Sequence, residues 1–501
     1  MKRALATAFA VSGLLGCSPV PQVAPPPAVP AAPPPSPAPA AVVVDPLGPR
    51  PELAPTPAFI PPEATEFSSK NGIHVWLLER HQLPIVSCDL TLPVGASSDP
   101  RGKAGVAHVT AKMLDEGAGK RGAIALAGAI GDIGARLTTD ANADASFVSV
   151  TVLKRNLVPA LAIFADVVTR PRFEPTEFKR VKDLWTTELL QREKDPDATA
   201  RVVYRAVLFG PDHPYGHPWD GTPSSAKAIT LTDVKRAYAL GWRPDRATLV
   251  CAGDVTQPEM AAAVESSLGS WVAPVAKAPP IVVPPAATGP WPKLVLVDRA
   301  DAPQAVIAAL GPGIAAADPE APALWRVNDA IGGSFTSRLN QDLREQRGYT
   351  YGARSRYSVS RGPGQLVSWA NVVTEKTGDA LAALVGDLTT FAKSGLTDDE
   401  VQRTRSQARG ELVGAYESVE SIAGHLAMDA SLGLGPDWQV KYNEKRDLAD
   451  KAQLNALASR FYDPTNAALV VVGPSSKVRP MIEKLGLPSP ELRDAEGNRL
   501  K

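Results

Sequence analysis

The chain has 501 residues, which is enough for two or three domains with sizeable hydrophobic cores. It carries 53 Lys and Arg and 53 Asp and Glu residues, so its formal net charge at pH 7 is zero. A balanced charge provides no general attraction to nucleic acid or to an anionic membrane surface. We therefore expect no nucleic-acid partner, and any binding site must be local.

The first 17 residues have the pattern of a targeting segment. Lys2 and Arg3 precede an apolar run over residues 4–16 that is too short to span a bilayer. The run ends in Leu14-Leu15-Gly16-Cys17, which resembles a bacterial lipoprotein box. We expect a lipoprotein signal peptide over 1–17, with Cys17 as the lipid-modified first residue of the mature protein. An ordinary cleaved signal peptide is the alternative.

Residues 18–62 are rich in Pro and Ala, which predicts an extended, semi-rigid spacer. A lipid on Cys17 anchors a protein without a membrane-spanning helix. We expect a cell-envelope lipoprotein that faces the periplasm. Ser18 differs from the aspartate that marks inner-membrane retention in some bacteria, which favours the outer membrane.

Each half of the remaining chain begins with strand-like segments, at residues 73–79 and 85–92 and again at 293–297 and 304–310. Amphipathic helices and a closing strand follow in each half, an order that is typical of an α+β fold. A segment dominated by Pro, Ala and Val separates the halves. The predicted parts are an N-terminal domain over 63–273, a linker over 274–292, a C-terminal domain over 293–487 and a polar tail over 488–501.

The two halves contain a weak internal repeat. Residues 173–180 recur as 396–403, each opening a charged, helix-like stretch. Residues 242–253 parallel 462–473, where a proline ends a helix and the next strand stops at a glycine. We interpret the chain as a duplication.

Cys88 and Cys251 both lie in apolar, strand-like runs. An oxidising compartment allows a disulfide between them, and two buried free thiols are the alternative. Neither cysteine has the spacing of a metal or redox motif.

The stretch from Val106 to Gly117 has the outline of the inverted zinc motif H-x-x-E-H. His108 stands at the first ligand position, but Ala111 replaces the glutamate that acts as general base and Lys112 replaces the second histidine. With Gly105 before it, this stretch resembles the first-helix signature of the insulinase/pitrilysin family of zinc metallopeptidases, which includes the mitochondrial processing peptidases.

A longer match lies in the second half. Residues 332–353 resemble the C-terminal signature of the same family, in which an arginine and a tyrosine seven apart reach the active site. Arg344 and Tyr351 occupy these two positions. The resemblance implies two homologous lobes, each a mostly antiparallel sheet covered by helices, that face each other around a cavity.

The resemblance also implies a third zinc ligand on a later helix, where Glu188 stands. His108 and Glu188 are then vestiges of a site with too few ligands for catalytic zinc. We expect no metal or other cofactor in this chain. One hypothesis is that Lys112 replaces the metal as a positive charge and pairs with Glu188; the alternative is that Lys112 points into cavity water.

His213 and His217 form a second pair of histidines four apart, but Pro214 and Gly216 break the helix that would align them. We therefore predict a structural turn at this position.

Arg344 and Tyr351 are the predicted catalytic residues. In the family, the arginine can bind a peptide carbonyl or carboxylate and the phenol can stabilise an oxyanion; the alternative is a solvated charge and a strand aromatic. The resemblance predicts a chain that is silent alone and donates this pair, as a heterodimer or homodimer, to proteolysis of a peptide substrate. Zinc is expected in the partner subunit. A non-catalytic peptide-binding or scaffold protein, and independent hydrolysis through other residues, are the alternatives.

Overall fold

The computed structural model describes residues 59–278, 280–286 and 291–500, which belong to one compact unit. The predicted signal peptide, Cys17 and most of the spacer lie outside the described residues. Within these ranges, no helix has the length and apolar character needed to cross a membrane.

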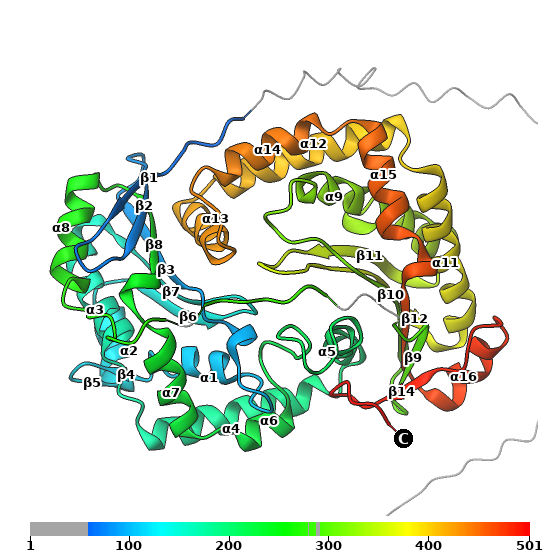
Figure 1. Ribbon diagram of the computed structural model, residues 1–501, viewed down its shortest axis with the longest axis horizontal. Coiled ribbons are helices and arrows are strands. Elements are labelled where there is room, and N and C mark those ends of the chain that lie inside the picture. The colour runs from blue at the N-terminus through cyan, green and yellow to red at the C-terminus, as the bar shows by residue number, and fades with distance from the viewer. Residues whose placement is uncertain (1–58, 279, 287–290, 501) are drawn as a thin grey trace, which may run out of the picture. The chain divides into compact units, whose positions relative to one another are not determined.

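The N-terminal lobe is built on a six-stranded sheet in the order β1-β2-β8-β3-β7-β6 (Figure 1). Its pairs are antiparallel except for β2 and β8, which run parallel. The strands are β1 (Thr65–Ser68), β2 (His74–Glu79), β3 (Ile85–Leu92), β6 (Arg136–Ala141), β7 (Ser146–Leu153) and β8 (Thr248–Gly253); β4 (Gly117–Ala118) and β5 (Arg121–Gly122) form a separate small ladder.

The C-terminal lobe repeats this topology. Its described sheet has the order β11-β12-β10-β13-β9-β14, so β9-β13-β10-β12-β11 corresponds to β2-β8-β3-β7-β6, again with one parallel pair at the equivalent place. The strands are β9 (Leu294–Asp298), β10 (Gln304–Pro312), β11 (Thr350–Ser358), β12 (Gln365–Val373), β13 (Ala468–Gly473) and β14 (Glu491–Arg493). The predicted duplication is thus confirmed, as is the α+β fold class.

Residues 488–501 were expected to form a polar tail, yet they supply β14, which pairs parallel with β9 at the sheet edge. Glu496 then contacts the N-terminal lobe, where Ser224 donates to it from its backbone N–H (3.0 Å) and its hydroxyl (2.6 Å). A three-residue strand at an edge is too short to produce a readable alternation of apolar and polar residues.

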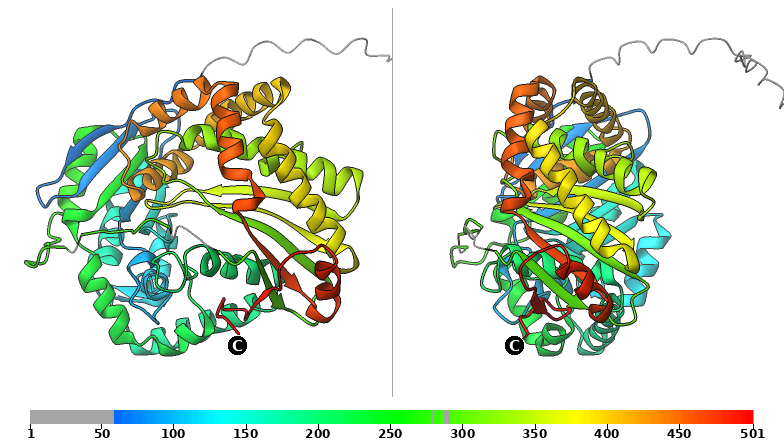
Figure 2. Two further views of the ribbon diagram at one scale, coloured as in Figure 1. Left: turned by 45° about the vertical axis from the view of Figure 1, so that its right-hand side comes forward. Right: turned by 90° about the vertical axis from the view of Figure 1, so that its right-hand side faces the viewer.

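Helices cover both sheets. In the N-terminal lobe they are α1 (Val106–Lys112), α2 (Ala123–Asp132), α3 (Leu157–Thr169), α4 (Pro175–Arg192), α5 (Pro196–Leu208), α6 (Pro223–Ala228), α7 (Leu231–Gly241) and α8 (Gln257–Leu268). In the C-terminal lobe they are α9 (Ala321–Asn328), α10 (Arg338–Asn340), α11 (Thr377–Ser394), α12 (Asp398–Ala415), α13 (Val419–Ser431), α14 (Trp438–Leu448), α15 (Lys451–Tyr462) and α16 (Ser475–Glu483). Figure 2 shows α11 and α15 side by side over one face of the C-terminal sheet.

The other face of each sheet is covered by a helix from the opposite lobe. In β10, the side chain of Ile307 packs in the core of its own lobe, whereas Val306 and Leu310 pack in a separate core with Val203 and Val207 of α5. This division follows from the two-residue period of a strand, which sends successive side chains to opposite faces.

The exchange is reciprocal. Helix α13 lies across β3 and β8, and its Ile422 and Leu426 share a core with Trp76, Leu78 and Val250 of the N-terminal sheet (Figure 1). Each lobe therefore buries one sheet face with a helix of the other lobe. Because both contacts are apolar cores, the two lobes stabilise each other.

A disulfide joins Cys88 of β3 to Cys251 of β8, which resolves the alternative left open by the sequence. The two residues are direct partners in the strand register and are fully buried. The bond connects positions separated by 163 residues, so it restricts a long loop in the unfolded chain.

The turn at residues 213–217 has a structural role, as predicted. The backbone N–H of Tyr215 donates to His213 Nδ1 (3.0 Å), which leaves the His213 Nε2–H to donate to the carbonyl oxygen of Pro284 (3.0 Å). The turn thereby fixes part of the predicted linker 274–292 against the end of α5. The described residues of that linker form neither helix nor strand.

Candidate functional site

Helix α1 is positioned by a glycine and an aspartate at its start. Gly105 has a φ of +91°, and a Cβ there would lie 2.7 Å from Trp185 Cζ2, so glycine is required by both conformation and space. The Asp99 carboxylate accepts from the backbone N–H groups of Gly105 (2.6 Å) and Ala107 (2.9 Å). These contacts seat the first turn of α1 against α4 and fix the place of His108.

His108 is 8% exposed and lies among aromatic rings. Its ring centroid is 5.2 Å from that of Trp219, in an edge-to-face arrangement, and 6.1 Å from that of Trp185. Burial lowers the pKa of His108, and its Nδ1 is enclosed without a hydrogen-bond partner. The imidazole is therefore a neutral group near pH 7.

A cavity of about 330 Å³ opens beside His108, between α1, β6 and α4. Lys112 and Glu188 both line it, and both side chains are exposed. The expected ion pair between them is not formed: within the described part of the chain, no ion pair within 4.0 Å contains either residue. The hypothesis of a substitute salt bridge is therefore wrong, and Lys112 faces the cavity instead.

The residues around this cavity do not fit a zinc ion. His108 and Glu188 are the two vestigial donors, Ala111 has no ligand atom, and Lys112 brings a positive charge to the place of the second histidine. Among residues 59–278, 280–286 and 291–500, no group of three or more His, Cys, Asp or Glu side chains is arranged to hold a metal. A catalytic zinc needs three protein ligands and an open position, so we derive no step of hydrolysis through zinc in this lobe.

Arg344 lies in an irregular helical segment of the C-terminal lobe. Residues Gln341–Gln346 form a π-helical turn, and a second π-helical turn spans Asp329–Gly333. Such turns occur frequently at functional sites. The guanidinium carbon of Arg344 lies 4.5 Å from the ring centroid of Phe335, its Nε lies 3.2 Å from Glu345 Oε1, and its side chain is 37% exposed.

Tyr351 projects from a β-bulge. Between Thr350 and Ala353 the register of β11 against β12 shifts by one residue, because three steps along β11 match two along β12. Thr350 Oγ1 accepts from the backbone N–H of Gly352 (3.1 Å), which fixes the bulge. A bulge redirects a side chain, and Tyr351 is 90% exposed.

Asn340 connects the two halves of this Arg/Tyr region. Its Nδ2 donates to the carbonyl oxygen of Phe335 (2.7 Å), and its Oδ1 accepts from the backbone N–H of Ala353 (3.3 Å). Phe335, whose ring lies under the Arg344 guanidinium, was not predicted as a site residue. Its aromatic character, nine positions before Arg344, was the only signal for it in the sequence. Neither Arg344 nor Tyr351 lines the cavity beside His108, whose walls all come from the N-terminal lobe.

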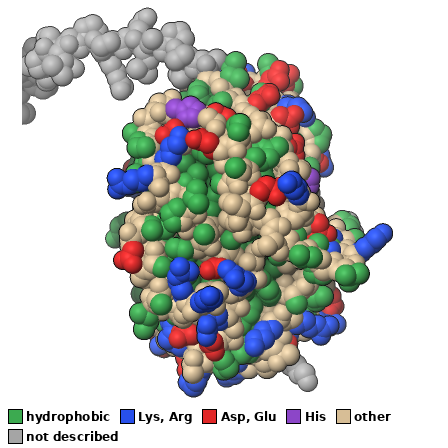
Figure 3. All heavy atoms as spheres, turned by 90° about the vertical axis from the view of Figure 1, so that its left-hand side faces the viewer, with side chains coloured by type: hydrophobic (Ala, Val, Ile, Leu, Met, Phe, Trp, Pro, Cys, Tyr) green, Lys and Arg blue, Asp and Glu red, His purple; other side chains and the backbone are tan. Residues whose placement is uncertain are grey.

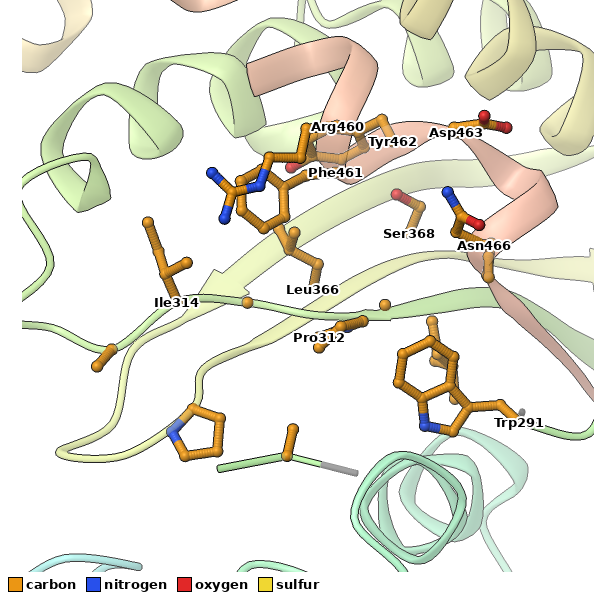
Figure 4. A pocket seen from close by; sticks show the side chains of 18 of the residues that line it. Trp291, Pro312, Ile314, Leu366, Ser368, Arg460, Phe461, Tyr462, Asp463 and Asn466 are labelled. Carbon is orange, nitrogen blue, oxygen red and sulfur yellow. The ribbon is translucent and has the colours of Figure 1, made fainter. Parts of the chain in front are cut away.

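A larger cavity of about 920 Å³ lies at the C-terminal sheet (Figure 4). Its walls are mainly apolar and include Trp291, Ile314, Leu366 and Phe461, with the Arg460 guanidinium carbon 4.7 Å from the ring centroid of Phe461. None of the site residues predicted from the sequence lines this cavity. Positive, negative and apolar side chains are interspersed on the face of the molecule in Figure 3, as the balanced charge leads one to expect.

Two family models match the chain. Residues 74–208 match the model of insulinase, peptidase family M16, and residues 228–408 match the model of the peptidase M16 inactive domain. The first includes His108, Lys112 and Glu188, and the second includes Arg344 and Tyr351.

Individual relatives agree with these matches. An uncharacterized zinc protease of Mycobacterium leprae is 27% identical over 416 residues, which cover 82% of this chain and 92% of that protein. A non-peptidase homolog of Helicobacter pylori is 26% identical over 177 residues, or 35% of this chain and 41% of that protein. The crystal structure of a peptidase M16 inactive domain from Pseudomonas fluorescens has the same fold, with a TM-score of 0.76 and 23% identity over 82% of this chain and 98% of that one. The chain belongs to the insulinase-type peptidase family, M16, as a member with a degenerate zinc motif.

Proposed function

We propose that this chain is a catalytically silent subunit of a peptidase complex and that it donates Arg344 and Tyr351 to a site completed by a partner with an intact H-x-x-E-H motif. The observation that carries the proposal is the contrast between the two regions. The zinc motif is degenerate, whereas the arginine and tyrosine are retained on a π-helical turn and a β-bulge that hold them at the surface.

The retained pair has a chemistry that suits this role. The Arg344 guanidinium offers N–H donors in a planar fork that matches a peptide carbonyl or carboxylate. The Tyr351 phenol is exposed, and its O–H can donate a hydrogen bond to an oxyanion that forms within reach. Stacking on Phe335 restricts the guanidinium, so less conformational entropy is lost when a peptide binds.

Peptide hydrolysis by the purified protein tests the proposal, with bound zinc quantified. The chain alone and the partner alone are each expected to show little activity, and their mixture is expected to cleave the peptide. Arg344→Ala is expected to remove the activity of the mixture. Arg354→Ala, an exposed arginine on the strand that carries Tyr351, serves as the control. Stoichiometric zinc together with activity from this chain alone contradicts the proposal.

A second candidate function is a non-catalytic peptide-binding or scaffold protein of the envelope. The sequence similarity to a non-peptidase homolog of Helicobacter pylori favours it. In this case the double variant Arg344→Ala/Tyr351→Phe leaves every cellular phenotype unchanged, and no mixture with a zinc-motif homologue cleaves peptides.

We also propose that Cys17 is lipidated and that the spacer holds the folded part away from the membrane on the periplasmic side, with the outer membrane as its site. The support is the sequence of residues 1–62 alone. Mass spectrometry of the mature protein, compared with the Cys17→Ser variant, tests the anchor. Fractionation of inner and outer membranes tests the site, and a soluble, unmodified wild-type protein contradicts both.

A further inference from the structure

A cavity of about 240 Å³ in the C-terminal lobe lies between α9, α12, α13 and α14. Its walls are mainly apolar and include three aromatic side chains, Trp325, Trp438 and Tyr442, each of which is only partly buried. The Arg446 guanidinium carbon lies 5.7 Å from the ring centroid of Tyr442, so this ring already contacts a cation. Trp325 and Trp438 supply the rest of the aromatic wall that a ligand can contact.

One buried carboxylate in this cavity has no cation beside it. Asp429 is 5% exposed, and the Gln439 side-chain amide donates to its Oδ1 (2.9 Å) and Oδ2 (2.8 Å). Within the described part of the chain, no ion pair within 4.0 Å contains Asp429. Burial raises the pKa of Asp429 to about 7, because a carboxylate in apolar surroundings is stable in its ionised form only beside an opposite charge. A cation in the cavity would supply that charge.

The other titratable side chains that line the cavity do not neutralise Asp429. Arg446 is 9% exposed; its Nη2 donates to a backbone carbonyl of α12 (2.5 Å), and its Nη1 lies 3.8 Å from Glu411 Oε2. Partial burial lowers the pKa of His425, so its imidazole is neutral near pH 7. Because Glu411 opposes the charge of Arg446, ionised Asp429 gives the lining an excess of one negative charge.

Aromatic walls around a buried carboxylate favour an organic cation. Alkyl groups on an ammonium nitrogen spread its charge over apolar surface, which aromatic rings attract through their π-electrons. A metal ion needs several oxygen, nitrogen or sulfur ligands, and the residues with coordinates include no group of three or more His, Cys, Asp or Glu arranged to hold one. A volume of about 240 Å³ is also below the 300–1,000 Å³ that is typical for drug-sized molecules, so the cation must be small.

We propose that this cavity binds a small alkylated ammonium ion. The positive nitrogen lies beside Asp429, and the alkyl groups contact Trp325 and Trp438. Neither Arg344 nor Tyr351 lines the cavity, so this site does not rest on the proposed peptidase complex.

Isothermal titration calorimetry of the full chain with choline tests the site. Asp429→Asn is expected to weaken binding about tenfold or more, because the charge of the ligand then has no buried partner. Trp438→Leu is expected to weaken it about threefold or more, as for the loss of one cation–π contact. Glu420→Gln changes an exposed carboxylate of α13 outside the cavity; this matched control is expected to retain the wild-type affinity.

Analogues of choline separate the charge from the alkyl groups and identify the source of the ligand. The alcohol 3,3-dimethyl-1-butanol has the shape of choline without the charge, and ethanolamine has the charge without the methyl groups. Both are expected to bind about tenfold more weakly than choline or worse. Glycerophosphocholine is the soluble headgroup of a lipid. Binding tighter than that of choline assigns a lipid headgroup as the source, and weaker binding assigns a free ammonium compound.

Asp429→Asn is expected to fold, because its amide oxygen still accepts from Gln439. Thermal unfolding checks this, and choline is expected to raise the Tm of the wild type and of Glu420→Gln but not that of Asp429→Asn. The proposal is overturned if choline does not bind at millimolar concentration, if either small analogue binds as tightly as choline, or if folded Asp429→Asn binds choline as the wild type does.

Discussion

The two lobes have the same sheet topology but differ at their functional regions. In the N-terminal lobe, a regular helix α1 carries His108 and Lys112 beside a cavity, and the metal-binding set is incomplete. In the C-terminal lobe, two π-helical turns and a bulge hold Arg344 and Tyr351 in irregular backbone. The N-terminal lobe keeps the sheet topology although its zinc motif is incomplete, so this fold does not depend on the metal site. Many alternating apolar residues specify a sheet, whereas a metal site depends on three or four side chains.

Restoring the missing zinc ligand and general base to the N-terminal lobe is expected to have the largest effect, a change in zinc binding. The double variant Ala111→Glu/Lys112→His recreates H-x-x-E-H on α1, with Glu188 already on α4. We expect zinc binding to change from undetectable to stoichiometric, because three ligands then surround the cavity. Zinc content after dialysis measures it. A variant that folds but binds no zinc shows that the lobe has lost the geometry as well as the residues.

Tyr351→Phe tests whether the C-terminal lobe retains its chemistry. In the complex with a zinc-motif partner, we expect a loss of about 10²–10³-fold in kcat, the typical effect of removing one oxyanion donor. Arg136→Ala, an exposed arginine on the equivalent strand β6, is the control from the other lobe and is expected to leave kcat unchanged. Equal effects of the two variants contradict a division of labour between the lobes.

The disulfide cross-links strands of the N-terminal sheet, so its removal is expected to affect that sheet more than the C-terminal sheet. The variant Cys88→Ala/Cys251→Ala is expected to reduce the free energy of unfolding by about 2–5 kcal/mol. Differential scanning calorimetry measures it, with the oxidised wild type as reference. Hydrogen exchange in β3 and β8 is expected to rise more than in β10 and β13, because the bond joins only the first pair. A uniform rise in both sheets indicates that the lobes unfold as one cooperative unit.

The two inter-lobe contacts are expected to differ in how pH affects their contribution to stability. Asp89 of β3 lies on the sheet face opposite the core of its own lobe, and burial raises its pKa to about 6. Because this pKa is above the ordinary value of 3.8, the folded state binds the proton more tightly, and stability falls as the pH rises from about 4 to about 6. The largest change in the free energy of unfolding from this shift in pKa is about 2–3 kcal/mol.

Urea unfolding at pH 4.5 and pH 7.5 measures this dependence for the wild type and for Asp89→Asn. We expect the variant to have the flatter profile, because its amide does not titrate. The core between α5 and the C-terminal sheet consists of apolar side chains, so we expect its contribution to stability not to depend on pH in this way. An unchanged pH profile in Asp89→Asn assigns the dependence to other groups.

The smallest effect is expected at Lys112. Since its side chain is exposed and no ion pair joins it to Glu188, Lys112→Met is expected to change the free energy of unfolding by no more than about 0.5 kcal/mol. Chemical denaturation measures it. A loss of several kcal/mol indicates that a salt bridge with Glu188 forms in solution, as the sequence first suggested.

The sequence predicted much of the fold because its strands alternate or are wholly apolar. The segment 85–92 was predicted as a strand and is β3, and the repeat at 242–253 and 462–473 is seen as β8 and β13 with their preceding turns. The prediction was poorer where function depends on side-chain placement. The ion pair of Lys112 with Glu188 was wrong, because sequence spacing placed the two residues at one cavity without giving the distance between their charges.

The amino-acid sequence by itself determined the α+β class, the duplication, the family, and the loss of the general base at Ala111 and of a zinc ligand at Lys112, since each of these is a local pattern of residue types. Only the tertiary structure decided the exchange of α5 and α13 between the lobes, the disulfide and the exposure of Tyr351. These features depend on which faces meet and on one extra residue in β11. Such contacts join residues far apart in the chain, and their energies come from packing that no local pattern records.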